Sequence, residues 1–247
     1  MDIRPTVILV PGAWSGAWVW DPTASDLRRR GSHAETVTLL GLEPGRSRAS
    51  IAEVRLEDHV DQLTAHVARA AGPVVLVGHS YSSMVTAQVA DRAGDQVAGL
   101  IHFGGYMPTD GRSLLDDWGG SESAREQERQ AIMEAGNVWL PPQRHMLEYE
   151  GDLTDADRNR LAERFTLHPG YTVTDPARLN ADTSGQPTTY VVLSPDETSE
   201  ASRSTDNPPS GWRIEHLMSG HWPMLSRPDE VVDLIAHEVV RYARARR

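Results

Sequence analysis

The sequence predicts an α/β fold: a mostly parallel sheet flanked by helices, with a helical segment inserted between two of its strands. Short apolar runs alternate with helical patterns up to about residue 106, and strand patterns return after residue 185. The run PVVLV at residues 73–77 is apolar throughout, as is typical of a strand covered on both faces. We expect a core of residues 1–106 and 186–247, and a cap of residues 107–185, which we call the cap segment.

Length and composition indicate one large globular domain. The chain has 247 residues, of which 39% are hydrophobic, enough to form a sizeable core. It contains no cysteine, which excludes disulfides, a thiolate nucleophile and a Cys-ligated metal. Its 35 acidic residues exceed its 24 basic residues, for a net charge of −11. This balance argues against nucleic-acid binding and weakly against binding to anionic membranes.

The elements before the cap segment follow in strand–helix order. A first strand over residues 6–10 ends at the turn signal Pro11-Gly12. We expect further strands over residues 33–40, 73–77 and 97–103, and helices over residues 20–30, 51–71 and 82–92. In the helix over 51–71, apolar residues with 4-3-4 spacing share one face: Leu56, Val60, Leu63 and Val67.

The cap segment is rich in polar residues, and its sequence predicts helices. Its best helices span residues 121–135 and 154–165, with a break at the Pro-Pro pair of residues 141–142. Strands are then expected over residues 188–193 and 212–217, separated by a long polar loop over 194–210. A helix over residues 228–244 begins with acidic and ends with basic residues, which complements the helix dipole.

Targeting and cofactor signals are lacking in the sequence. The first ten residues do not have the pattern of a signal peptide, and no apolar run approaches the roughly 20 residues that a membrane helix needs. We therefore expect a cytoplasmic protein without a membrane partner. No HExxH pair, Walker loop or GxGxxG run is present, so we expect no cofactor and no metal.

The most informative stretch is VVLVGHSYSS, residues 74–83. A strand runs into Gly78-x-Ser80-x-Ser82 and then into a helix. Such a sharp turn lifts a serine Oγ above the sheet edge, and small residues two positions before and after the serine avoid clashes. Ser82 stands where a second glycine is usual. The pattern predicts that Ser80 is a nucleophile.

A serine hydroxyl needs a base and the base needs a carboxylate. His221 follows the predicted last strand and precedes the last helix, so it lies on a loop that can reach Ser80. Asp196 follows the strand TTYVVL and is the expected acid; Glu197 and Asp206 remain alternatives. The order serine, acid, histidine is the one found on this type of sheet.

An oxyanion needs two hydrogen-bond donors. The backbone N–H of Tyr81, directly after the nucleophile, is one candidate, and the N–H of Ala13, in the loop after the first strand, is the other. Gly12 lets that loop approach closely. Trp14, beside this loop, and Trp222, directly after the base, are the candidate substrate-binding residues.

Four blocks, VLVPGAWSGAWVW, VGHSYSS, SPDE and SGHWPMLSRPDE, together resemble the α/β-hydrolase superfamily. Within it they look most like the branch of plant methyl-ester esterases and hydroxynitrile lyases and their bacterial relatives. The resemblance implies an α/β-hydrolase fold, with Ser80 as nucleophile, His221 as base and Asp196 as acid. It also implies Ala13 and Tyr81 as the oxyanion donors.

Two positions depart from the family pattern. The usual His-Gly at the start is Pro11-Gly12 here, and the lysine that follows the catalytic histidine in hydroxynitrile lyases is Trp222. The second departure favours hydrolysis over lyase chemistry. Ser80 at the turn disfavours the relatives that use an aspartate nucleophile.

The sequence thus predicts a carboxylic ester hydrolase that acts on a small apolar ester through an acyl-enzyme. The same triad could instead act on a lactone, a thioester, a C–C bond or a natural-product intermediate. From a different class, the alternative is a non-hydrolytic homologue that binds a small molecule in the cap cavity. The oligomeric state cannot be read from the sequence.

We expect three other histidines to lie outside the catalytic machinery. We expect His79, beside the nucleophile, to be structural. We expect His59 to be solvated on its helix, and His102, in a strand interior, to be buried with its hydrogen bonds satisfied.

Overall fold

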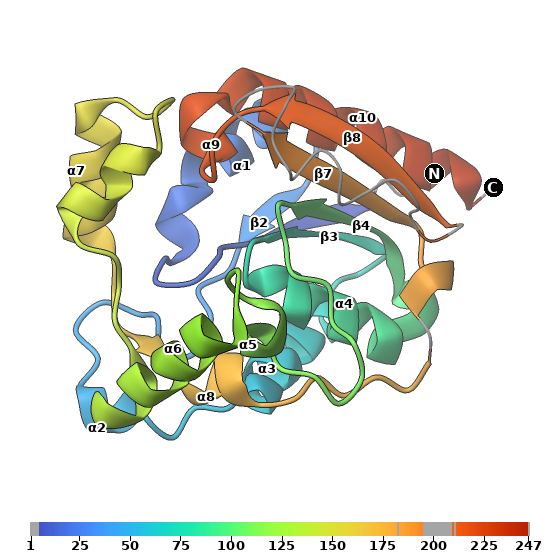
Figure 1. Ribbon diagram of the computed structural model, residues 1–247. Coiled ribbons are helices and arrows are strands. Elements are labelled where there is room, and N and C mark those ends of the chain that lie inside the picture. Colours follow the sequence, from blue (N-terminus) through green and yellow to red (C-terminus); the bar gives the residue numbers. More distant parts are fainter. Residues whose placement is uncertain (1–4, 182, 195–208, 210, 247) are drawn as a thin grey trace.

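The computed structural model describes residues 5–181, 183–194, 209 and 211–246. Its main feature is a six-stranded sheet in the order β2-β1-β3-β4-β7-β8, in which every pairing is parallel (Figure 1). The strands are β1 (Thr6–Val10), β2 (Ala34–Thr36), β3 (Val74–His79), β4 (Val97–Phe103), β7 (Thr188–Ser194) and β8 (Trp212–Met218). This confirms the predicted fold class.

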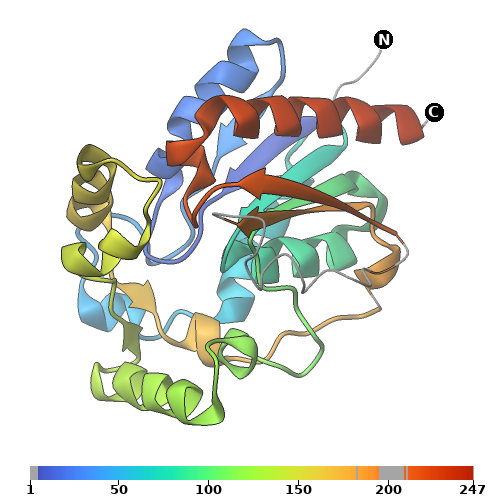
Figure 2. The same ribbon diagram turned by 45° about the horizontal axis from the view of Figure 1, so that its top comes forward.

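Helices cover both faces of the sheet, as Figure 2 shows. Helices α1 (Asp21–Arg29) and α10 (Pro228–Ala245) lie on one face, and α3 (Leu56–Ala68) and α4 (Ser82–Ala93) lie on the other. Along β1 the apolar side chains alternate between the two faces: Val7 and Leu9 join the core under α1 and α10, whereas Ile8 and Val10 join the other. This two-sided burial is why strands β1 and β3 are apolar throughout. The short helices α2 (Arg48–Ile51) and α9 (Pro223–Ser226) precede α3 and α10.

A tyrosine anchors α10 to the sheet. Tyr242 lies over Gly99 of β4, where an added Cβ would come within 2.5 Å of its ring. The Tyr242 hydroxyl donates to the carbonyl of Leu100 at 2.7 Å. The missing side chain at Gly99 therefore lets the aromatic ring pack directly on the strand.

The chain between β4 and β7 forms separate small elements beyond the sheet's carboxyl edge (Figure 1). They are α5 (Leu114–Asp117), α6 (Glu122–Glu134), β5 (Val138–Trp139), α7 (Asp155–Arg164), β6 (His168–Pro169) and α8 (Tyr171–Thr174). Short 3₁₀ helices add to the fold at Ala17–Val19, Gly94–Gln96, Arg144–Tyr149 and Thr183–Gly185. Strands β5 and β6 pair antiparallel as a second, two-stranded sheet. The division of the chain at residues 107 and 185 stays a prediction.

Two predicted elements differ in extent. The strand expected over residues 33–40 is only β2. The N–H of Val37 still donates to the Leu9 carbonyl of β1, but the residues after it bond to side chains instead of a neighbouring strand. For example, the N–H of Leu40 and the carbonyl of Thr38 both bond to Gln62. The helix expected over residues 51–71 begins at Leu56, where the Asp58 carboxylate accepts the N–H of Arg55 and caps the first turn.

The turn between β3 and α4 is tied to β1 by Ser82. Its Oγ accepts the N–H of His79 at 2.8 Å and lies 2.8 Å from the carbonyl of Val10, to which it donates. Ser82 is fully buried. A serine at this position therefore does what a glycine could not, because its hydroxyl joins the ends of two neighbouring strands.

We predict that Ser82→Ala lowers the free energy of unfolding by about 1–3 kcal/mol, because it leaves a buried N–H and a buried carbonyl without their partner. Urea denaturation followed by circular dichroism measures this change. Ser123→Ala, at an exposed position on α6, is the control and should shift stability by no more than about 0.5 kcal/mol. Equal unfolding midpoints for the two variants would contradict the role given to Ser82.

Candidate active site

Ser80 occupies the turn after β3 with an unusual backbone conformation. Its φ is 52°, in the left-handed region that non-glycine residues rarely adopt. An added Cβ on Gly78 would lie 2.8 Å from Thr86 Oγ1 and 3.2 Å from the Ser83 backbone, so α4 packs directly against the strand end. This is the sharp strand–turn–helix that the sequence predicted, and it leaves Ser80 partly exposed.

The loop after β1 lies against the turn at Ser80. An added Cβ on Gly12 would lie 2.8 Å from His79 Nδ1 and 3.2 Å from Ser80 Cβ. Among the described residues, neither the N–H of Ala13 nor that of Tyr81 has a hydrogen-bond acceptor. Both amides therefore remain available to a ligand beside Ser80, as a pair of oxyanion donors requires.

His221 reaches the same edge of the sheet from the loop after β8. Its carbonyl accepts a hydrogen bond from Nε2 of the buried His79 at 2.7 Å, and the two imidazole rings lie 4.8 Å apart. Burial lowers the pKa of His221 to about 4, so its ring is neutral at pH 7. A neutral imidazole is the form that accepts a proton from a hydroxyl.

His79 is held neutral as well. Burial lowers its pKa far below the ordinary value, and the proximity of His221 lowers it further. Its Nε2–H therefore serves as a donor to the His221 carbonyl. Its burial and its bond to the backbone of the histidine loop match the structural role expected for His79.

The expected acid, Asp196, lies outside the described residues, as do the alternatives Glu197 and Asp206. The end of the preceding strand is close to the histidine loop, because the Ser194 carbonyl accepts the N–H of Ser219 at 3.1 Å. This hydrogen bond joins two residues that each stand two positions before a predicted triad residue: Ser194 before Asp196, and Ser219 before His221.

The two predicted substrate-binding tryptophans differ in exposure. Trp222 is only 4% exposed and packs against the rings of His79 and Phe165, at 5.1 and 5.5 Å. Trp14 is partly exposed and stacks obliquely on Trp139 at 4.2 Å. Their contact with a substrate stays a prediction.

Trp14 also adopts a left-handed backbone, with φ 60°, and the cap segment holds it there. Its N–H donates to His168 Nδ1 at 3.3 Å, its indole N–H donates to the Trp139 carbonyl at 3.2 Å, and its carbonyl accepts the N–H of Thr166 at 2.9 Å. Since Trp14 follows Ala13 directly, these three bonds fix the loop that carries a predicted oxyanion amide.

Buried polar side chains surround Tyr81, the other predicted oxyanion residue. The Tyr81 hydroxyl donates to His59 Nδ1 at 2.7 Å, and His59 Nε2 donates to the Leu40 carbonyl at 2.7 Å. The prediction of a solvated His59 is wrong: the side chain is fully buried, because it receives and gives one hydrogen bond inside the core. The prediction for His102 is also wrong in part. It is buried, but neither ring nitrogen has a hydrogen-bond partner among the described residues.

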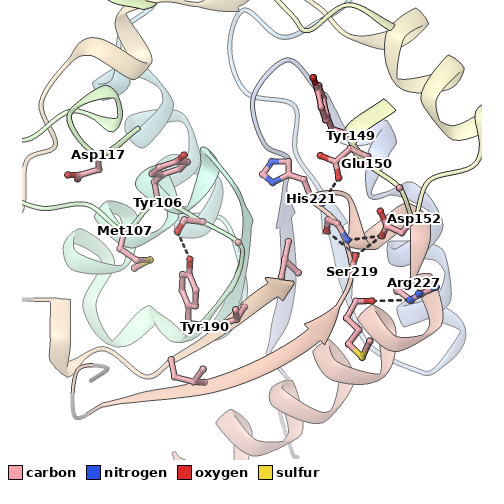
Figure 3. Close-up of a pocket in the computed structure, with 18 of the residues that line it drawn as sticks. Tyr106, Met107, Asp117, Tyr149, Glu150, Asp152, Tyr190, Ser219, His221 and Arg227 are labelled. Carbon is pink, nitrogen blue, oxygen red and sulfur yellow. Dashed lines mark hydrogen bonds between the residues drawn. The ribbon is translucent and has the colours of Figure 1, made fainter. Parts of the chain in front are cut away.

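A cavity of about 1110 Å³ adjoins the site (Figure 3). Tyr106, Met107 and Tyr190 lie on one side of it, and Glu150 and His221 lie on the other. Its described lining includes His221 and does not include Ser80, so the cavity meets the site on the histidine side.

Sequence reasoning missed Glu150 and Asp152, two carboxylates of the cap segment that contact the histidine loop. Glu150 accepts the N–H of His221 at 2.8 Å, and Asp152 accepts the N–H of Gly220 at 2.7 Å. They lie 71 and 68 residues away along the chain, and no motif marks them.

The described part of the chain contains neither a metal-binding cluster nor a membrane-spanning helix. Within the described ranges, no cluster of three or more histidine or acidic side chains is arranged to hold a metal ion. None of the helices in the same ranges has the length and apolar character needed to cross a membrane.

Sequence comparison finds relatives with esterase names. Over 109 residues the chain is 38% identical to a carbendazim hydrolyzing esterase of Nocardioides sp., covering 44% of this chain and 45% of the relative. Over 111 residues it is 33% identical to esterase PIR7B of Oryza sativa, covering 43% and 41%. The matched part thus spans less than half the length of these curated relatives.

Structure comparison finds the same fold over nearly the whole chain. An extracellular α/β-hydrolase from a Paenibacillus species superposes with a TM-score of 0.78 at 18% identity, covering 94% of this chain and 98% of that one. The methylesterase MES16 from Arabidopsis gives a TM-score of 0.73 at 17% identity, covering 96% and 99%. A family model described as the alpha/beta hydrolase family matches residues 7–234. The chain therefore belongs to the alpha/beta hydrolase family.

Proposed function

We propose that this protein is a serine hydrolase that cleaves a carboxylic ester of a small apolar molecule through Ser80, His221 and Asp196. The observation that carries the proposal is the left-handed turn at Ser80. Beside it lie two amides without an acceptor in the described part of the chain, and a neutral imidazole lies at the same sheet edge. The esterase names of the two curated relatives support ester hydrolysis. A cytoplasmic location stays a prediction from the sequence.

In the proposed reaction, His221 takes the Ser80 proton while Oγ bonds to the ester carbonyl carbon. The electron pair of the C=O bond moves to oxygen, where the N–H groups of Ala13 and Tyr81 stabilise the charge. Collapse of this intermediate breaks the ester C–O bond, and His221 gives its proton to the leaving alcohol. Water, deprotonated by His221, then releases the acid in the same manner.

Support for Asp196 as the acid comes from the reach of the chain. Asp196 follows Ser194 by two residues, a span of at most about 7 Å. The Ser194 carbonyl is bonded to the N–H of Ser219, two residues before His221. A carboxylate at Asp196 would hold the imidazole tautomer and stabilise the imidazolium that forms during the reaction.

The cavity supports a neutral small-molecule substrate. Its described lining contains the carboxylates of Asp117, Glu150 and Asp152 against one guanidinium, that of Arg227. This excess of negative charge disfavours an anionic substrate, whereas the aromatic and methionine side chains suit an apolar one.

We predict that Ser80→Ala lowers kcat/KM for short-chain p-nitrophenyl esters by about 10⁴-fold or more, because the nucleophile is lost. In the wild type, a phosphonate serine trap should give an adduct on Ser80, located by mass spectrometry of the digested protein. Ser83→Ala is the matched control, since Ser83 belongs to the same SYSS run and should leave turnover near the wild-type rate. Full turnover by Ser80→Ala would exclude the mechanism, and saturable binding without turnover would favour a binding protein.

We predict that the acidic limb of kcat/KM lies between about pH 4 and 6.5. Burial depresses the pKa of His221 from 6.5 to about 4. The carboxylate of Asp196, the proposed acid, would raise this pKa part of the way back. As the pH falls through this pKa, the imidazole takes up a proton and can no longer act as a base. Initial rates at low substrate across pH 4–8 measure the limb. A midpoint above 6.5 would contradict a buried base.

We also predict that the fold loses stability as the pH falls below about 6.5. Burial lowers the pKa of His59 to about 4 and that of His102 to about 3, and it lowers those of His79 and His168 as well. In the unfolded chain these rings take up protons at about 6.5, so below that pH the unfolded state binds more protons than the folded state. Urea midpoints at pH 7.5 and pH 5 test this, and equal midpoints would contradict it. The same data show at which pH values the rate profile reports on folded enzyme.

A further inference from the structure

The loop of the proposed base is bonded at three consecutive residues to carboxylates of the cap segment (Figure 3). Asp152 Oδ2 accepts the hydroxyl of Ser219 at 3.2 Å and the N–H of Gly220 at 2.7 Å. Glu150 Oε2 accepts the N–H of His221 at 2.8 Å. The main chain that aims the His221 ring is thus held from outside the sheet.

Gly220 permits this close approach. An added Cβ there would lie 2.4 Å from Asp152 Oδ1 and 2.5 Å from Glu150 Oε2. Any side chain at this position would push the two carboxylates away from the loop. The glycine and the acidic pair therefore form one fitted contact between segments that are about 70 residues apart.

The residues that carry the carboxylates are themselves fixed. Arg158 of α7 donates to the carbonyl of Glu150 at 2.9 Å and to that of Leu147 at 3.2 Å. Its side chain is only 15% exposed. The carboxylates consequently belong to an anchored turn, and their positions relative to His221 are determined by the cap segment.

The two peptide groups that flank His221 are both bonded, in opposite directions. The N–H of His221 donates to Glu150, and its carbonyl accepts from His79, which directly precedes Ser80. The backbone orientation of a histidine sets where its ring can point, and displacement of a catalytic group by about 1 Å can cost about 10²-fold in rate. Glu150 can therefore affect the reaction rate through the position of His221, without contacting the substrate.

We propose that Glu150 is a positioning residue for His221: it sets the position of the imidazole by accepting the His221 N–H, and Asp152 anchors the preceding two residues. The proposal rests on the proposed function, in which His221 is the base. It adds that catalysis depends on the length of the side chain at position 150, because a shorter one cannot reach the N–H.

Two variants distinguish the effect of side-chain length at position 150 from the effect of its charge. Glu150→Gln keeps the length and a carbonyl oxygen that can accept the N–H, whereas Glu150→Asp keeps the charge but is one methylene too short. We expect Glu150→Asp to lower kcat about 10- to 100-fold with KM within about 2-fold, and Glu150→Gln to stay within about 3-fold of the wild type. The matched control is Glu148→Asp, on the same 3₁₀ turn, where the carboxylate is 71% exposed; its kcat should be unchanged.

The measurements are kcat and KM for a p-nitrophenyl ester, the rate of phosphonate labelling at Ser80, and the melting temperature of each variant. A kcat for Glu150→Asp equal to or above that of Glu150→Gln, in folded proteins, would overturn the proposal. So would a drop in melting temperature with kcat unchanged, since that is a purely structural role. If Glu150→Asp does not fold, Glu150→Ala takes its place, because it removes the acceptor of the His221 N–H altogether. A kcat for folded Glu150→Ala equal to that of Glu150→Gln would overturn the proposal, and a 10-fold or greater loss relative to Glu150→Gln would support it.

If the proposed function itself is wrong, the same measurements give a different set of results. In that case wild-type Ser80 is not labelled, or His221→Ala turns over ester as fast as the wild type, and the positioning role falls with it. If wild-type Ser80 is labelled and His221→Ala is inactive but the Glu150 variants match the wild type, only the positioning role is overturned.

Discussion

The left-handed backbone at Ser80 is the constraint on which the rest of the site depends. A non-glycine residue held at φ 52° costs of order 1–3 kcal/mol and persists only where its surroundings enforce it. Here two glycines, which have no side chain, and one polar side chain hold this conformation. Gly12 and Gly78 let the neighbouring loop and helix close in on the turn, and the Ser82 hydroxyl ties it to the end of β1. The resulting turn places Ser80 above the edge of the sheet, where it is partly exposed and a substrate can reach it.

The cap segment contributes to the site on both of its sides. On one side it holds Trp14, next to Ala13, by three hydrogen bonds. On the other side it holds the His221 loop through Glu150 and Asp152. Neither contact requires a substrate. The cap segment therefore does more than wall a cavity, because the proposed oxyanion loop and the loop of the proposed base both depend on where it lies.

The sheet was predictable from the sequence because its signal is local. Buried strands are apolar runs, and the strand–turn–helix around Ser80 lies within ten consecutive residues. The loop position of His221 follows from the same pattern. The contacts of Glu150 and His59 could not be predicted, because they join residues far apart along the chain. Helical spacing, three residues after Leu56 and four before Leu63, already places His59 on the apolar face, but nothing in the sequence identifies a tyrosine hydroxyl and a backbone carbonyl as its partners.

Glu150 and Asp152 are both partly buried, Glu150 more deeply, and the pKa values of their carboxyls shift in opposite directions. Burial opposes the ionisation of Asp152, but hydrogen bonds from Ser226, Gly220 and Ser219 outweigh it and hold the pKa of this carboxyl below its ordinary value. Burial also opposes the ionisation of Glu150. There it prevails over the single N–H of His221, and the nearby Asp152 charge adds to it, so the pKa of Glu150 is raised. Glu150 is the more deeply buried of the two and has fewer donors, and both differences favour its neutral form relative to that of Asp152. Asp152 is therefore the more readily ionised carboxyl, whereas Glu150 holds the His221 N–H through a single hydrogen bond. A protonated Glu150 still offers a carbonyl oxygen to the His221 N–H, so the contact needs the length of this side chain more than its charge.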